Sequence, residues 1–404
     1  SGNYNVAIGY EAGEETTSGD SNTWVGGLAG AACTEGNNNV GVGRNALIQN
    51  TTGSENTALG VFALDAVTTS SNSTAIGYNA ATANTSTAIT AVGHQCLRSN
   101  TTGNGNNALG KNALFTNTTG QYNIAIGYDS LQQNNADNNV AVGHDALKLN
   151  TSGTENVGIG ANALDSSTTA GYNTAVGTGA MKDCTTGSIN VAIGREALEN
   201  LTTGAKNVGV GRSTLGGTLT GEENVGVGDS AGAAMTTGSS NVAIGAEALK
   251  ANTTGANNTA VGKGALQTVT TFGANVAVGT RALQNATSAE DNVAIGYQTA
   301  TNLTTGDRNI FMGHNTQPSS AAVDLEYIFG TTLTGKGQQT CFLGGNTGTF
   351  NEANESHFDT TSDSRIKKNI VNYDTGLSII NQLQVRNFEY KTQDEIITDS
   401  PELK

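Results

Sequence analysis

The sequence is poor in charge and contains no long apolar run. Of its 404 residues, 13% are charged, about half the roughly 25% of an average soluble domain. Acidic residues dominate, and the net charge is −15. Such a surface repels nucleic acid and anionic membranes, so neither is expected as a partner. No apolar stretch approaches the roughly 18 residues of a membrane-spanning helix, and no membrane insertion is expected.

Proline and cysteine are nearly absent as well. The chain has 2 Pro, and none precedes Pro318, so nothing interrupts a ladder of backbone hydrogen bonds over most of its length. Its 4 Cys are scattered and fit no metal-binding spacing. Cys33, Cys96 and Cys184 fall at recurring positions of a repeat and are interpreted as small apolar filler. No metal site and no cofactor are expected.

Glycine is abundant, with 54 residues, and many of these recur at a fixed period. The unit is typified by the segment 292–296, Asn-Val-Ala-Ile-Gly, and its last glycine anchors each copy. The gap between anchors is 17 residues, with two gaps of 16. A period this strict over some three hundred residues predicts a stacked repeat architecture. The anchors are glycines 9, 26, 43, 60, 77, 93, 110, 127, 143, 160, 177, 194, 211, 228, 245, 262, 279, 296 and 313.

The positions around each anchor, counted from the glycine as zero, keep their residue type. Position −4 is Asn in 17 of 19 repeats, −3 is mostly Val, Ile or Thr, −2 is Ala or Gly in 17, and −1 is always Val, Ile, Leu or Met. Position +4 is usually Leu, and +8 to +10 often read Thr-Thr-Gly. This pattern predicts a short strand, a glycine turn and a second corner at Thr-Thr-Gly. Asn at −4 is expected to form a ladder from coil to coil.

The repeat length selects among repeat folds. Helical repeats need about 33 residues and propeller blades about 40, whereas 17 residues suit one coil of a solenoid. We therefore predict an all-β fold, a parallel β-solenoid (β-roll) of about 19–20 coils over residues 1–317. At about 4.8 Å per coil, the stack would be on the order of 90 Å long.

The strand alternates, so positions −3 and −1 share one face and −2 lies on the other. We expect the −3/−1 face to fill the coil interior together with the Leu at +4. One coil then offers about three large apolar side chains of roughly 1.5–3 kcal/mol each, against an ordering cost of roughly 1–2 kcal/mol per residue. The small residues at −2 are expected to supply further burial by packing on two other copies of the chain in a homotrimeric rod. The alternative is that −2 only faces a tight coil interior.

The repeated Asn-Val-Ala-Ile-Gly resembles the left-handed parallel β-roll of trimeric autotransporter adhesin heads. Repeats that carry Thr-Thr-Gly are also similar to those of phage fibre proteins. The resemblance covers roughly residues 1–313 and implies a trimeric, extracellular-facing fibre. Residues 318–361, in which the period fades, are expected to form a neck or transition region.

Residues 362–404 differ in composition and open with Ser-Asp-Ser-Arg-Ile-Lys-Lys. A short helix carrying Leu377, Ile380 and Leu383 and a strand at 385–391 are expected after it. This stretch resembles the start of the intramolecular chaperone domain of endosialidase-type phage tailspikes, and we expect it to be incomplete. The resemblance implies trimer assembly followed by self-cleavage.

The same resemblance implies which residues would carry out the cleavage. The scissile bond would lie between Thr361 and Ser362, with Ser362 as nucleophile. Lys367 would act as its base, provided that desolvation lowers the lysine pKa. The reaction would be a single-turnover Ser-Lys autoproteolysis with no external substrate.

The function expected from these features is a structural viral fibre, a tail fibre or tailspike, for host attachment. Its partners would be two further copies of the chain, the baseplate or tail proteins of the virion, and a host surface receptor such as a glycan. A bacterial cell-surface trimeric adhesin is the first alternative. An ice-binding solenoid, suggested by the paired threonines, is the second, although adjacent threonines point in different directions along a strand.

Overall fold

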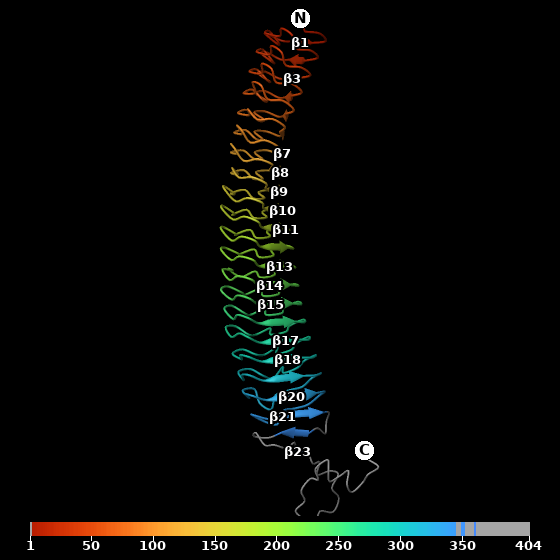
Figure 1. Cartoon of the computed structure of the whole chain (residues 1–404), viewed down its shortest axis with the longest axis vertical. Helices are drawn as coiled ribbons and strands as arrows, with labels where there is room; N and C mark the ends of the chain where they lie inside the picture. Colours follow the sequence, from red (N-terminus) through yellow and green to blue (C-terminus); the bar gives the residue numbers. More distant parts are fainter. Residues whose placement is uncertain (1, 345–348, 352–358, 361–404) are drawn as a thin grey trace, which may run out of the picture. The chain divides into compact units, whose positions relative to one another are not determined.

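The computed structural model describes residues 2–344, 349–351 and 359–360. The chain divides into two units, residues 1–360 and 361–404, and all described residues lie in the first. That unit is a stack of coils, each contributing one short strand, with the strands above one another along one side and the turns along the other (Figure 1). No helix occurs among the described residues, so no helical membrane span is found there.

Most strands are three residues long and end just before an anchor glycine. They are β1 (Val6–Ile8), β2 (Thr23–Val25), β3 (Val40–Val42), β4 (Thr57–Leu59), β5 (Thr74–Ile76), β6 (Thr90–Val92), β7 (Asn107–Leu109), β8 (Ile124–Ile126), β9 (Val140–Val142), β10 (Val157–Ile159), β11 (Thr174–Val176), β12 (Val191–Ile193), β13 (Val208–Val210), β14 (Val225–Val227), β15 (Val242–Ile244), β16 (Thr259–Val261), β17 (Val276–Val278), β18 (Val293–Ile295), β19 (Ile310–Met312), β20 (Tyr327–Gly330), β21 (Cys341–Gly344), β22 (Thr349–Asn351) and β23 (Asp359–Thr360).

Each strand pairs with the next one along the chain. From β1 to β21 all pairs are parallel and bring like positions together, as where Val208 pairs with Val225 and Gly209 with Gly226. Strand β22 then pairs antiparallel with β21, and β23 pairs antiparallel with β22. The prediction of an all-β parallel solenoid of about 20 coils with a 17-residue repeat is confirmed. The assignment of 318–361 to a neck stays a prediction.

The prediction for the coil interior is wrong about which strand face is inside. The middle residue at −2 is buried in every strand from β2 to β19, while its neighbours at −3 and −1 are partly or fully exposed. The coil is narrow, and the leucine at +4 fills its interior from the side opposite the strand. Only the face that carries the small residue at −2 can therefore point inward. At Gly158 an added Cβ would lie 3.3 Å from the Leu147 side chain. Position −2 is therefore small to fit inside its own coil, which was the alternative reading.

The anchor glycines are required by both conformation and space. Gly160 has a φ of 134°, and a Cβ on it would lie 2.4 Å from the carbonyl oxygen of Gly177 in the next coil. Any side chain would therefore clash with the neighbouring backbone. The same stacking of glycine over glycine repeats along the column.

The Asn ladder at −4 is confirmed and lies entirely inside the stack. Asn224 is fully buried. Its Oδ1 accepts the backbone N–H of Asn241 at 3.0 Å and the side-chain amide of Asn241 at 3.1 Å. Its own amide donates to Asn207 Oδ1 at 3.1 Å and to the carbonyl of Gly238, three residues before Asn241 in the next coil, at 2.8 Å. Each asparagine thus ties its coil to both neighbours and joins the strand to the Thr-Thr-Gly corner.

A second buried Asn column at position +7 was missed, although its signal is in the sequence. It runs through five successive coils as Asn84, Asn100, Asn117, Asn134 and Asn150. The side-chain amide of each of the last four donates to the previous residue's Oδ1, at 2.7 to 3.4 Å. In many coils the threonine at +8 forms an outer ladder, in which its hydroxyl donates to the carbonyl of the equivalent residue in the next coil.

Near the start of the stack, a tryptophan replaces the small residue at −2. Trp24 is buried, and three positions around its ring are glycine. A Cβ on Gly13, Gly30 or Gly41 would come within 2.4 to 2.7 Å of the indole. Gly13 and Gly30 stand where other coils have Leu, so the loss of leucine volume accommodates the larger ring.

At the other end, a carboxylate terminates the Asn ladder. Glu326 occupies position −4 before Gly330, and its backbone N–H donates to Asn309 Oδ1 at 2.8 Å. Its carboxylate accepts the N–H groups of Ser319 at 2.9 Å and Gly337 at 2.8 Å. Because a carboxylate only accepts, it closes the run of amides without offering a donor to a further coil.

We predict that Asn224→Ala destabilises the stack strongly. The substitution leaves the buried N–H of Asn241 and the carbonyl of Gly238 without these partners, at a cost of about 2–4 kcal/mol for the two groups together. The matched control is Thr237→Ala, an exposed residue of the same coil. Denaturant unfolding followed by circular dichroism measures both variants, and equal stability of the two would contradict a stabilising ladder.

Candidate functional site on the outer faces of the stack

The predicted cleavage residues Thr361, Ser362 and Lys367 lie outside the described residues, as do the expected helix and the strand at 385–391. The Ser-Lys assignment therefore stays a prediction. The functional surfaces that can be described belong to the solenoid. Two of them differ sharply in chemistry.

The first surface, here called the strand face, consists of the outward side chains at positions −3 and −1 of β1 to β20. Position −1 is aliphatic in β1 to β18, Met312 in β19 and Phe329 in β20, and neither position carries a charge in any of these strands. Several of its large side chains are well exposed, among them Ile193 at 44% and Ile244 at 38%. With strands about 4.8 Å apart, these side chains form one continuous apolar stripe. Monomeric proteins rarely expose a stripe of this extent.

The second surface, here called the turn edge, consists of positions +1, +2 and +5, which follow each anchor glycine. Its side chains contact one another within and between coils. The histidines at +1 are exposed, and each stacks on the tyrosine at +1 of the preceding coil. The ring centroids are 5.5 Å apart for Tyr78 and His94, 5.2 Å for Tyr128 and His144, and 5.4 Å for Tyr297 and His314.

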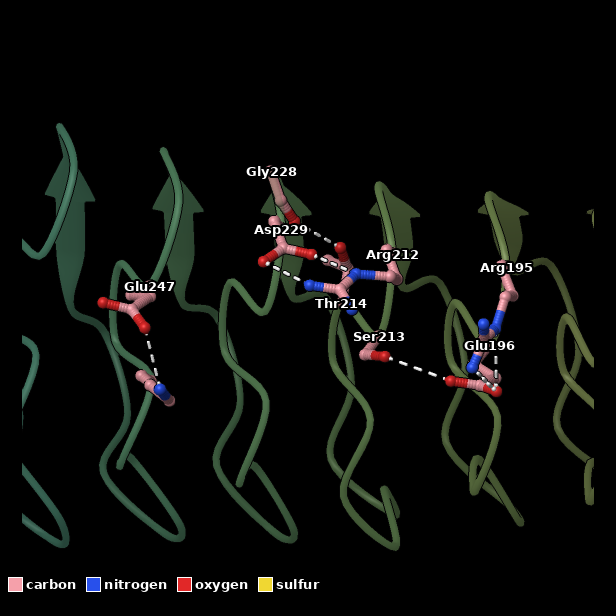
Figure 2. A network of polar contacts seen from close by, with 9 residues as sticks. Arg195, Glu196, Arg212, Ser213, Thr214, Gly228, Asp229 and Glu247 are labelled. Carbon is pink, nitrogen blue, oxygen red and sulfur yellow. Dashed lines mark hydrogen bonds and ion pairs between the residues drawn. The ribbon is translucent and has the colours of Figure 1, made fainter.

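Figure 2 shows a charged part of the turn edge, where cations meet carboxylates. Arg195 contacts Glu196 at 2.7 Å, and Arg212 contacts Asp229 of the next coil at 2.7 Å. These hydrogen-bonded arginines hold the pKa of both carboxyls below their usual range. Ser213 Oγ also donates to Glu196 at 3.3 Å. The pairs are exposed, so they contribute little to stability and chiefly neutralise this part of the edge.

The described residues contain no cluster of three or more side chains that could hold a metal ion. Burial raises the pKa of the Cys96 and Cys184 thiols to about 12, so neither is a nucleophile at neutral pH. Cys184 lies in the +7 column, and its thiol contacts the carbonyl of Gly187 at 3.4 Å. The interpretation of these cysteines as buried filler fits this placement.

Comparison with known proteins bears on the end of the chain. The fold defines the class of the first unit, a parallel β-solenoid repeat protein. Residues 362–402 match the family model described as Peptidase_S74, chaperone of endosialidase. The match begins at the serine that the sequence motif singled out. A search of curated proteins found no match. The chain thus combines a 17-residue-repeat solenoid with a C-terminal stretch similar to this chaperone family.

We predict that Asp65→Asn stabilises the protein at neutral pH. Asp65 lies at +5 on the turn edge, and partial burial raises its pKa to about 6, against about 3.9 in an unfolded chain. The folded state therefore loses stability as pH rises from about 4 to 6 and carries the full penalty above that range. Because the carboxyl is partly solvated, we expect a gain of about 1–2 kcal/mol for the variant at pH 7.5.

This gain should disappear near pH 4, where the wild-type carboxyl is largely protonated. Thermal unfolding at both pH values measures it. Asp229→Asn serves as the control, because Arg212 lowers the pKa of that exposed carboxyl and its neutralisation brings no gain. A stabilisation of Asp65→Asn that is independent of pH would contradict the assignment.

Proposed function

We propose that this chain is the shaft of a homotrimeric viral fibre, a tail fibre or tailspike that faces outward from the virion and attaches it to a host. The observation that supports this most is the strand face, an uncharged apolar stripe along twenty strands. Exposing it to water costs roughly 25 cal/mol for each Å² of apolar surface. The stripe therefore favours an assembly that covers it.

Copies of the same chain fit this stripe best. A rotation axis parallel to the stack keeps each coil level with its counterpart, so Val and Ile of one copy meet Val and Ile of another along the whole length. The 17-residue repeat gives every coil the same face, and a partner with the same spacing matches all of them together. The choice of three copies rests on the similarity of residues 362–402 to a chaperone of endosialidase, since that resemblance implies trimer assembly.

The surface that joins the chains in the proposed trimer therefore differs from the one that the sequence suggested. The small −2 column was expected to admit the other copies, but it lies inside the coil. The Val and Ile residues take over that role from the outside. Baseplate or tail proteins at one end and a surface receptor such as a glycan complete the proposed set of partners.

The C-terminal stretch would register the three chains and then cut itself off. In this step Ser362 Oγ attacks the carbonyl carbon of Thr361, and the amide bond gives way to an ester while the Ser362 nitrogen becomes a free amine. Lys367 takes the hydroxyl proton and passes it to that amine, and water hydrolyses the ester. The cut is made once per chain and has no external substrate.

The chaperone similarity favours the viral fibre over a bacterial adhesin, which would share the solenoid alone. An ice-binding role receives less support, because the threonines at +8 use their hydroxyls within the stack. Thr253 Oγ1, for example, donates to the carbonyl of Thr270 at 3.1 Å. The threonine hydroxyls at +8, one of the two threonine columns, are thus used in hydrogen bonds within the stack.

The trimer can be tested at the strand face. We predict that the double substitution Ile193→Asp and Ile244→Asp prevents assembly of the full-length protein, because it buries six carboxylates against one another in the trimer. Light scattering after size exclusion should give three times the chain mass for wild type and a lower mass for the variant.

The matched control places two aspartates at Thr203 and Thr254, exposed residues of the Thr-Thr-Gly corners. This variant should remain trimeric. A wild-type protein with the mass of one chain would contradict the proposal, as would trimers that tolerate aspartate at both isoleucines.

The cleavage step makes a separate prediction. Full-length protein carrying Ser362→Ala should keep its C-terminal segment, because no hydroxyl remains to attack Thr361. Lys367→Met should slow the cut strongly for lack of a base. Intact mass spectrometry after expression reads both outcomes, and processing of Ser362→Ala at the same bond would contradict the Ser-Lys mechanism.

A further inference from the structure

The acidic residues of the solenoid leave two long gaps, residues 66–128 and residues 248–289, and the first is the longer. Between Asp65 and Asp129 the sequence has no Asp or Glu, although the whole chain has 34 of them against 19 Lys and Arg. This first gap spans nearly four coils and still contains Arg98 and Lys111. This section of the stack is therefore locally cationic, with acidic coils before and after it.

The cations of the first gap lie on the turn edge among aromatic rings. Arg98 lies over the ring of Phe115 at 5.4 Å from its centroid, and Lys111 lies over the ring of Tyr128 at 5.4 Å. Tyr78 stacks on His94. The ring faces are thus occupied by neighbouring side chains, while the tyrosines remain 47% and 43% exposed. We call these six side chains the cation–ring patch.

The charges of this patch are not balanced by carboxylates, in contrast to several other places on the same edge. Glu196, for example, neutralises Arg195, and Glu247 neutralises Lys250. Neither Arg98 nor Lys111 forms an ion pair within the described part of the chain. A ring holds a cation in place without cancelling its charge. Both charges therefore stay available to a ligand.

We propose that the cation–ring patch binds a linear acidic polysaccharide that lies along the stack. The coils repeat at about 4.8 Å, so Lys111 and the hydroxyls of Tyr78 and Tyr128, all at +1, form a line of hydrogen-bond donors, and Arg98 at +5 adds a cation on the same edge. The stacked rings order these side chains before binding, which lowers the entropy lost on binding. A negatively charged partner complements this patch. The choice of a polysaccharide as the ligand rests on the proposed attachment function. The description of the patch itself does not depend on that function.

Duplex nucleic acid fits the patch less well. It carries a phosphate charge about every 1.7 Å and extends past the first gap in both directions. There it meets acidic coils, beginning with Asp65 at one side and Asp129 at the other. A polysaccharide chain is thinner and carries its charges more sparsely. The turn edge follows the anchor-glycine turn, so a trimer packed through the strand face leaves the patch open to solvent.

The test uses the full-length protein, with polygalacturonate and dextran sulfate as anionic probes and neutral dextran and a DNA duplex as comparisons. Biolayer interferometry should show binding of at least one anionic polysaccharide that weakens with salt, and little binding of dextran or DNA. Preferential binding of polygalacturonate would indicate a carboxylated polysaccharide as the ligand, and preferential binding of dextran sulfate would indicate a sulfated one. Arg98→Gln with Lys111→Gln should reduce the affinity at least tenfold.

The matched control is Arg195→Gln with Lys250→Gln, which removes two cations from the same edge outside the first gap and should change the affinity less than twofold. Binding of neither anionic polysaccharide, tighter binding of DNA, or an equal loss in both variants would overturn the proposal. Light scattering on the same samples reports the trimer independently. A trimer that fails to bind would therefore overturn the patch alone, and a protein that binds as a single chain would overturn the trimer alone.

Discussion

The buried ladder of asparagine amides is the interaction on which the rest of the structure depends. A coil of 17 residues has too little interior for a large apolar core, because Ala or Gly at −2 and Leu at +4 nearly fill it. The side-chain amide of an Asn at −4 such as Asn224 instead satisfies two backbone groups of the next coil, the carbonyl of Gly238 and the N–H of Asn241. Buried polar groups carry a high cost when unpaired. The ladder therefore fixes the register between successive coils.

The same constraint divides the molecule into faces with different freedom. Positions that point inside keep their residue type, and changes there come with compensation, as with Trp24 and the glycines around it. Positions on the turn edge vary freely, from Tyr78 to Asp229. Because stacking repeats each position along one line, a few substitutions on that edge can turn one section of it cationic and leave the next acidic. The strand face stays uncharged from β1 to β20 and apolar at −1, which suits a permanent contact.

The repeat and its parallel stacking could be predicted from the sequence, since the period and the invariant glycine leave few alternatives. The Asn ladder followed from a polar residue at one fixed position. The inward face of the strand could not be settled in the same way, because alternation shows which residues share a face and not which face is inside. The size of position −2 was the available clue, and it was assigned to contacts between chains. In the structure position −2 lies inside the coil, and the residues at −3 and −1 face outward.

Other features differ in how much signal they gave. The second Asn column at +7 and the glycines around Trp24 were readable in the sequence but only became meaningful once the coil interior was known. For the cleavage site, the motif beginning at Ser362 predicted the family stretch that the comparison found at 362–402. The geometry of Ser362 and Lys367 depends on a region outside the described residues. A motif can name those residues but cannot place a lysine beside a serine.

The proposed fibre requires three stacks that meet through their strand faces. Electron cryo-microscopy of the full-length fibre in cross-section tests this directly. We expect three coils around a central axis, with the side chains of β12 and β15, Ile193 and Ile244 among them, pointing toward that axis. A single coil with its strand face in solvent, or three coils joined through another face, would contradict it.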